Sequence, residues 1–565
     1  MAKIIDAYKK VPLMFQAQTN GRCQLNYIDK EKEQQDAEFW TSEWVEKAEP
    51  KAPKFDQKIQ SKTYQISWRF VTNGGQDDGI IRPVIGAKGW PYYPGSSMKG
   101  AFRQACQKLY PEKVAYYCGS EEQPAKLRFH GAYPIDKSWQ DQDRLVDLVH
   151  PQQGWQVKTD QTRQKPSGES AFTLISLFEP KLQFGISSTV ASDRIDWEQV
   201  WKIWDRAISS GIGCRVSAGY GQPVQQKDNV IYRAYLKGQG RAAELLSGES
   251  EFRPNIFKAA IRGHALRIFG GLTNEKTSDR LVEQLFGGVI GNGSVGLLAV
   301  NWRNTAKPEL NIFEDGYDEP TYFVKGILRW LVTRSLASEE KKALTKLVKA
   351  LMRFAMLLGG FGKSWRRIDH RLFYDQYYEG RKTKPLIGCH WQWQKESLER
   401  NPDNLVRRLE KVGQAIEQII TTAQEWMRLQ NIEPRSPAQW REAWHSDNVQ
   451  VWGRLASDRD ESEAVKWFHG AYRPAIREID QAEGSIYRTS LTGQIGQISR
   501  MWHRMYPVIR LQKDPDNPRK PIVRPTAQYF ELLTIFPDDS PDSREFMAFL
   551  RSQPEGFQQL WPLVE

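Results

Sequence analysis

The sequence predicts an α+β protein built from two similar units, with a helical insertion in its C-terminal half. A strand-like alternation over residues 64–70 leads through a turn into a helix, and the same order returns from Val230 onward. In both halves the helix carries a lysine and an arginine four residues apart, and a glycine-rich loop follows at a similar distance. Residues 405–430 instead place apolar side chains at helical spacing.

Composition favours a multidomain protein with a polyanionic partner. A chain of 565 residues is too long for one compact core, so we expect two or three domains. Its 80 lysines and arginines exceed its 68 carboxylates, which gives a formal net charge of +12. Such a balance suits nucleic acid without proving it, and 21 tryptophans suit either stacking on unpaired bases or an ordinary core.

Cysteine usage and hydropathy predict a reduced, cytoplasmic protein. The five cysteines, at positions 23, 106, 118, 214 and 389, form no Cys-x-x-Cys pair, which argues against a disulfide framework or a zinc site. Lys3 and Asp6 place charged residues within the first six positions, without the apolar run of a signal peptide, so we expect none. No apolar run approaches the roughly 18 residues of a membrane helix, and we expect no membrane partner.

Composition shifts and returning strand patterns set the expected domain boundaries. These are a polar N-terminal extension over 1–61, a first domain over 62–229, a second over 230–394, a helical insertion over 395–480, and a C-terminal segment over 481–565 that completes the second domain.

A turn rich in glycine and serine lies directly before the first helix, at residues 94–103. Ser96 or Ser97 is expected to cap that helix, which leaves the N–H groups of its first turn facing an anion. Lys99 and Arg103 lie four residues apart and therefore share one helix face. The arrangement predicts a phosphate-binding turn.

The same elements recur in the second half. Lys258 and Arg262 repeat the spacing of the first pair of cations, and the loop at 359–367 repeats the role of the loop at 211–221. Four glycines in eleven residues exclude a regular helix or strand over 211–221. A lysine and arginine at this spacing are common by chance, but the paired pattern predicts an internal duplication.

Residues 94–103 closely resemble the Pro-Gly-Ser-Ser-x-Lys-Gly-x-x-Arg motif of the RAMP superfamily, the RNA-binding backbone subunits of type III CRISPR effector complexes. Residues 147–151 and the 211–221 loop are similar to the subunit of the Cmr branch that caps the 3′ end of the guide RNA.

In the second half, residues 252–254, 258–267 and 285–288 resemble another RAMP variant, whose arginine-rich helix precedes a Leu-Phe-Gly turn. Two such units in one chain look like the fused subunits of type III-D systems. The resemblance implies a ferredoxin-like, RRM-type core in each unit and contact with the guide RNA backbone through helix N-termini and glycine-rich loops. It also implies a guide RNA, a complementary target RNA and other effector subunits as partners: a large polymerase-like subunit, further RAMP subunits and a small subunit.

The residues expected to bind RNA on this basis are Ser96, Ser97, Lys99, Arg103, Gly211, Gly213, Arg215, Gly219, Gly221, Lys258, Arg262, His264, Arg267, Lys363, Arg366 and Arg367. For His264, a half-buried packing role is an open alternative. For Arg366 and Arg367, the alternative is an exposed surface pair.

Catalysis is a separate question. The resemblance implies an aspartate before the turn in target-cutting subunits, but Ile81 stands at that place. Asp77 and Asp78 lie just upstream and are the candidate catalytic residues, either as a general base or as holders of a Mg²⁺-bound water. Ordinary solvated loop carboxylates are the alternative for both. Cys389-His390 lacks the further ligands of a metal site, so none is predicted.

Two other functions remain as alternatives. A stand-alone endoribonuclease of the same fold, processing precursor RNA, needs a general acid–base pair, and His130 and His150 are the first-half histidines available. A basic scaffold without an RNA role is the other, and the repeated pattern of cations and glycines argues against it.

Overall fold

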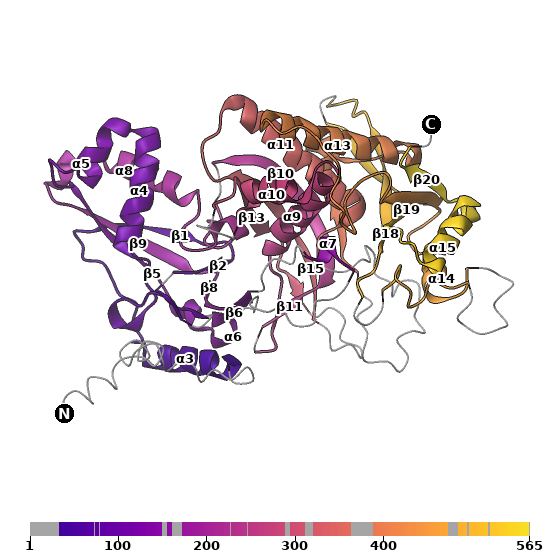
Figure 1. The fold of residues 1–565 in the computed structure, drawn as a ribbon. Coiled ribbons are helices and arrows are strands. Elements are labelled where there is room, and N and C mark those ends of the chain that lie inside the picture. The colour runs from indigo at the N-terminus through magenta and orange to yellow at the C-terminus, as the bar shows by residue number, and fades with distance from the viewer. Residues whose placement is uncertain are drawn as a thin grey trace.

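The computed structural model describes residues 33–72, 74–77, 80–149, 155–160, 172–225, 228–245, 247–288, 294–310, 320–362, 388–472, 484–493, 497–517 and 520–563. The described chain forms three units with the same βαββαβ order, which lie in a row from the indigo N-terminal part to the yellow C-terminal part (Figure 1). The predicted α+β class is confirmed.

The first unit is a ferredoxin-like sheet covered by two helices. It runs β1 (Gln60–Gln65), α4 (Gly95–Leu109), β5 (Leu127–Pro134), β9 (Lys181–Ser188) and α8 (Trp197–Ile208), with the strands in the order β1-β9-β5. Its last strand is reduced to a bridge between Ile66 and Pro223 beside β1. Both helices lie on one face of the sheet, where the Phe184 ring of β9 lies 4.9 Å from Trp204 of α8.

Small sheets and a helix surround this unit. One pairs β2 (Arg69–Phe70) with β8 (Leu177–Phe178), and another has the order β3 (Gln76–Asp77), β4 (Ile80–Ile81), β7 (Phe172–Ile175) and β6 (Val146–Val149). Part of the predicted polar extension belongs to the core, because α3 (Glu33–Lys47) buries Trp44 against Trp139 with ring centroids 4.8 Å apart.

The second unit shows the ferredoxin-like order in full. It consists of β10 (Val230–Arg241), α9 (Asn255–Gly270), β13 (Leu298–Asn304), β15 (Thr321–Val332), α11 (Ser338–Phe354) and β16 (His390–Trp393), with the strands in the order β13-β15-β10-β16. Helices α9 and α11 cover one face, where the Phe257 ring lies 5.0 Å from the Trp302 ring and Trp330 contacts Met352.

A third unit occupies the C-terminus, where we expected a helical insertion and the completion of the second domain. It consists of β17 (Gln450–Ala456), α14 (Glu463–His469), β18 (Met501–Gln512), β19 (Ile522–Ile535), α15 (Pro541–Arg551) and β20 (Gln558–Trp561), again with the first and third strands central. The strands of residues 481–565 therefore complete a third sheet and not the second one. One apolar core nevertheless runs through the second and third units and contains Trp330, Trp444 and Trp502.

The remaining elements are α5 (Val114–Cys118), α6 (Gln142–Leu145), α7 (Trp155–Lys158), β11 (Ala243–Glu244), β12 (Ser250–Glu251), α10 (Glu275–Phe286), β14 (Glu309–Leu310), α12 (Lys395–Arg400) and α13 (Val412–Leu429). Within the predicted helical insertion over 395–480, the structure shows α12, α13 and α14, but also the strand β17. Among the described helices, none is long and apolar enough to span a bilayer. Within the described residues, Cys106, Cys118, Cys214 and Cys389 form no disulfide.

Candidate nucleic-acid interface

Helix α4 begins at Gly95, one residue before the serines that were expected to cap it. Its N-cap is Pro94, in an extended conformation and without a side-chain cap, so the predicted serine cap is wrong. Ser96 and Ser97 lie exposed in the first turn. A Cβ on Gly95 would lie 2.1 Å from the carbonyl oxygen of Phe129, which means that only glycine permits this close approach to β5.

The first turn of α4 is open to solvent. The Gly95 N–H donates to Tyr92 Oη at 3.1 Å, and the Met98 N–H donates to the Pro94 carbonyl at 3.0 Å. Within the described residues, the N–H groups of Ser96 and Ser97 have no acceptor. Free N–H groups at the start of a 15-residue helix attract an anion.

Lys99 and Arg103 extend this site along the outer face of α4. Met98, Phe102, Ala105 and Cys106 take the inner face, so the two cations point away from the core. Arg103 is exposed and Lys99 half-buried. Neither forms an ion pair with any carboxylate that the structure describes. Both charges are therefore available to a ligand.

The loop at 211–221 adopts a backbone that its glycines make possible. Gly211, Gly213, Gly219 and Gly221 all have positive φ, between 60° and 100°. A Cβ on Gly221 would lie 1.8 Å from the Ile212 carbonyl oxygen, so the two ends of the loop are in van der Waals contact. Arg215, also at positive φ, has its guanidinium 5.5 Å from the Tyr220 ring.

This loop lies next to the residues that lead into α4. A Cβ on Gly213 would touch the Phe70 ring, and that ring lies 5.9 Å from Tyr93. Burial raises the pKa of Tyr93, and the nearby Cys214 thiol of the loop raises it further. The structure thus brings together two motifs that lie more than a hundred residues apart in the sequence.

The loop also contacts the second unit. Lys258, in the first turn of α9 and 5% exposed, donates from Nζ to Ser217 Oγ at 2.7 Å. Burial, together with the nearby charges of Arg262 and Arg215, lowers the pKa of Lys258 to about 7. Three cations therefore meet at the junction between the units.

The rest of the second cation-bearing helix points inward. His264 is 3% exposed and its Nε2 lies 2.8 Å from the Gly360 carbonyl oxygen. Arg267 pairs with Glu442 and lies 5.0 Å from the Trp502 ring, while Arg262 donates to the Gly287 carbonyl at 2.7 Å. For His264 the structure shows the packing arrangement that was the alternative to RNA contact.

A buried ionic network holds the loop in place between the first and second units. Asp147 accepts from Tyr220 Oη at 2.6 Å and pairs with Arg253 at 2.9 Å. Arg69, which has no exposed side-chain surface, donates from Nε to Glu251 at 2.9 Å. Asp147 and Arg253 lie in segments that carried the family resemblance, but nothing in the sequence connected Arg69 with Glu251.

The third unit closes the equivalent helix N-terminus with its own carboxylate. Buried Glu531 of β19 accepts from the Glu463 and Ala464 N–H groups at 3.1 and 3.0 Å, and also from the Ser462 hydroxyl. Arg454 Nε lies 2.6 Å from it. The Glu531 carboxylate thus occupies the position that an external anion would take at this helix N-terminus.

The candidate catalytic and downstream loop residues are only partly described. Asp77 lies in β3, paired with Ile80, and Asp78, Lys363, Arg366 and Arg367 lie outside the described residues. The described residues contain no group of three or more potential metal ligands. Mg²⁺-dependent cutting by Asp77 and Asp78 therefore stays a prediction. His130 Nε2 pairs with Ser187 Oγ at 2.8 Å and not with a tyrosine or lysine.

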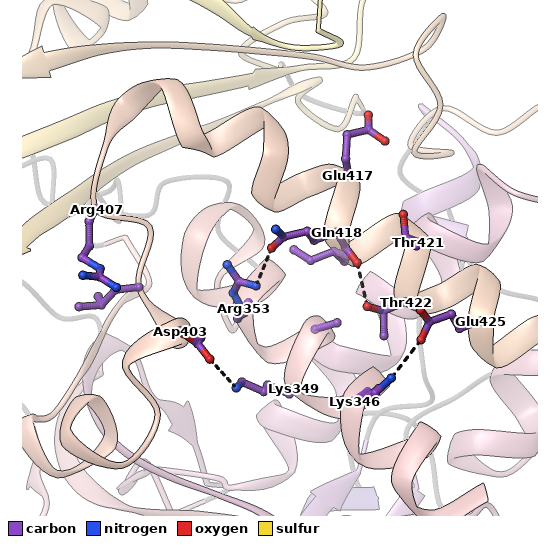
Figure 2. A pocket seen from close by; sticks show the side chains of 13 residues that line it. Lys346, Lys349, Arg353, Asp403, Arg407, Glu417, Gln418, Thr421, Thr422 and Glu425 are labelled. Carbon is purple, nitrogen blue, oxygen red and sulfur yellow. Dashed lines mark hydrogen bonds and ion pairs between the residues drawn. The ribbon is translucent and has the colours of Figure 1, made fainter. Parts of the chain in front are cut away.

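A cavity of about 690 Å³ lies between α11 and α13 (Figure 2). Its cations are largely neutralised at the rim, where Lys346 faces Glu425 at 3.5 Å and Lys349 faces Asp403 at 3.8 Å. Arg353 donates to Gln418 at 3.4 Å within it. Mixed charges of this kind fit a polyanion less well than the open turn of α4 does.

A family model described as the RAMP superfamily matches residues 79–224, a stretch that contains both the α4 turn and the glycine-rich loop. The chain contains a RAMP superfamily domain. This confirms the RAMP resemblance of the first half, whereas the resemblance of residues 252–288 to another RAMP variant stays a prediction. The second and third units repeat the ferredoxin-like strand order.

Other comparisons add little to the RAMP match. No curated protein matches the chain. The solved structures that resemble it include a chain of the type III-B Cmr-beta complex bound to cognate target RNA, with 21% identity over 29% of this chain and 57% of that one, at a TM-score of 0.22. Cmr6 from Pyrococcus furiosus has 16% identity over 30% of this chain and 98% of its own, at a TM-score of 0.21. At such TM-scores the likeness supports no further conclusion.

Proposed function

We propose that this chain is a guide-RNA-binding backbone subunit of a type III CRISPR ribonucleoprotein, which holds the duplex of guide and target RNA for antiviral defence. The observation that carries the proposal is the open first turn of α4, with Lys99 and Arg103 unpaired among the described residues, inside the segment that matches the RAMP model.

The physical argument concerns sequence-independent binding. Backbone N–H groups and cations contact phosphates, which are the same at every nucleotide, so base pairing between guide and target is left to read the sequence. The glycine-rich loop beside Tyr93 brings more backbone to the same place. Other type III effector subunits are the proposed partners, and the net charge of +12 is consistent with a shared RNA.

Target cutting with Mg²⁺ at Asp77 and Asp78 is a further part of the proposal. Changing either aspartate to alanine in the assembled complex is expected to remove one cut in a complementary RNA. An unaltered cleavage pattern would make the chain purely structural.

The assembly is tested by isolating the chain with its native partners and sequencing the RNA that comes with it. We expect a discrete RNA that contains a repeat-derived segment. Loss of all RNA from the purified assembly would refute the proposal. Cleavage of a precursor RNA by the chain alone would favour the stand-alone endoribonuclease, although the His130 imidazole has only Ser187 as its hydrogen-bond partner among the described side chains.

A further inference from the structure

The sheet of the second unit has one face covered by α9 and α11 and a second face of different chemistry. Along β10, the side chains of Tyr232, Ala234 and Leu236 are buried in the core beneath the helices. Successive strand residues point to opposite faces, so Arg233, Tyr235 and Lys237 point to the other face, where all three are half-buried.

The strand register places more cations on that second face. Arg233 lies directly opposite Arg329, and Lys237 lies directly opposite Lys325. Arg303 of β13 pairs with Ile327, two residues before Arg329, and so shares the same face. Like charges directly opposite one another destabilise a sheet. Five cations on three adjacent strands are therefore an energetic cost to the free protein.

This cost is not relieved within the described chain. None of the five cations pairs with a carboxylate there, and Arg329, only 5% exposed, donates from Nη1 to Asn301 at 2.8 Å. The Nε atoms of Arg329 and Arg233 are buried and have no acceptor among the described residues. Burial, together with the charges of Arg233 and Arg303, lowers the pKa of Arg329 to about 10.

Two aromatic rings accompany the cations. Tyr235 lies on the same face as Arg233, with the Arg400 guanidinium 5.2 Å from its ring. Phe323 lies two residues before Lys325, whose Nζ is 5.3 Å from the Phe323 ring. Glu309, opposite Phe323 on β14, is a carboxylate at the edge of this face. Rings between cations on a sheet are the chemistry that holds unpaired nucleotides.

We propose that this face of the second sheet binds a single-stranded segment of RNA, separately from the α4 turn and the glycine-rich loop. The cations of β10, β13 and β15 hold the phosphates, and Tyr235 and Phe323 stack on bases. The choice of RNA over another polyanion rests on the proposed function, while the site itself rests on the unpaired cations. RNA phosphates then supply the negative charge that the protein lacks beside Arg233, Lys237 and Lys325, which are more accessible than Arg329.

The test measures the affinity of the full chain for a short oligouridylate at several salt concentrations. The variant Arg233→Gln/Lys237→Gln is expected to bind at least about tenfold more weakly, with a salt slope smaller by about one to two units. Lys342→Gln is the control, because Lys342 is exposed on α11 over the opposite side of the sheet, and it should bind like the wild type.

Two further measurements distinguish a misfolded variant from a true loss of RNA binding, and the failure of this inference from the failure of the proposed function. Thermal unfolding of the double variant should match or exceed that of the wild type, because a repulsion is removed. Ultraviolet crosslinking of the wild type to the oligouridylate should label a peptide from 230–241. Wild-type affinity in the double variant, with weaker binding in Lys99→Ala/Arg103→Ala, would overturn this inference alone. Absence of RNA binding by the wild type would overturn the proposed function with it.

Discussion

The charge of Lys258 gives a stability difference that can be worked from the structure. Burial and two nearby arginines lower its pKa from 10.5 to about 7, and no described carboxylate compensates them. In the unfolded chain, Lys258 stays protonated up to about pH 10.5. Below about pH 7 it is protonated in the folded state too, so folding buries a positive charge. At about 1.4 kcal/mol per pKa unit, the cost to the folded state is roughly 5 kcal/mol below pH 7.

The pH dependence follows from the same numbers. Between the two pKa values the unfolded state binds the extra proton, so stability rises with pH, and at about pH 9 the cost is down to roughly 2 kcal/mol. Lys258→Met removes the charge and also the hydrogen bond to Ser217, which is worth about 1 kcal/mol. The free energy of unfolding of the variant should therefore exceed that of the wild type by roughly 4 kcal/mol at about pH 6 and by roughly 1 kcal/mol at about pH 9.

Urea unfolding of the wild type, Lys258→Met and the exposed control Lys342→Met at both pH values measures this difference. Other titrating groups cancel when variant and wild type are compared at the same pH. A gap that is equal at the two pH values, or a variant less stable than the wild type at about pH 6, would refute the reasoning.

Two further predictions concern the helix N-termini. Gly95→Ala is expected to lower stability and weaken RNA binding, because the new Cβ would clash with the Phe129 carbonyl. Gly100→Ala on the same helix has no atom within 4 Å of its Cβ and should stabilise the protein by about 0.5–1 kcal/mol. Thermal unfolding of both variants checks this, and equal shifts in melting temperature would contradict it. Glu531→Gln should destabilise the third unit by roughly 3 kcal/mol at neutral pH, because Arg454 loses its buried partner and keeps only the more exposed Glu461. Burial alone would raise the pKa of Glu531, but His503, Ser462 and Arg454 lower it overall. The contribution of the Glu531 carboxylate to stability is therefore lost as pH falls. If the stability difference between variant and wild type were the same under acidic and neutral conditions, this would contradict the prediction.

The features that the sequence predicted correctly are those that depend on a few neighbouring residues. Gly95 with Lys99 and Arg103, and the positive φ values of Gly211–Gly221, follow from turn and helix chemistry that operates over a few residues. The third unit was missed because β17 is short and follows a tryptophan-rich segment that reads as helical. Pairings such as Arg69 with Glu251, 182 residues apart, leave no local pattern.

Long-range packing also explains why the α9 cations have surroundings that their spacing does not predict. Lys258 repeats the spacing of Lys99, but spacing does not say which face another unit covers. The structure buries Lys258 against Ser217 of the first unit, and it leaves Arg103 exposed. The two cation pairs therefore have the same position in their units and different surroundings.

The most direct test of the central claim compares RNA binding by the wild type, Lys99→Ala/Arg103→Ala and the control Lys108→Ala, which changes an exposed lysine in the last turn of the same helix. The account predicts that the double variant binds RNA of any sequence more weakly and that its salt slope falls by about two units. It predicts unchanged binding for Lys108→Ala. Equal affinity and salt slope in the wild type and the double variant would contradict the claim that the open turn of α4 holds RNA.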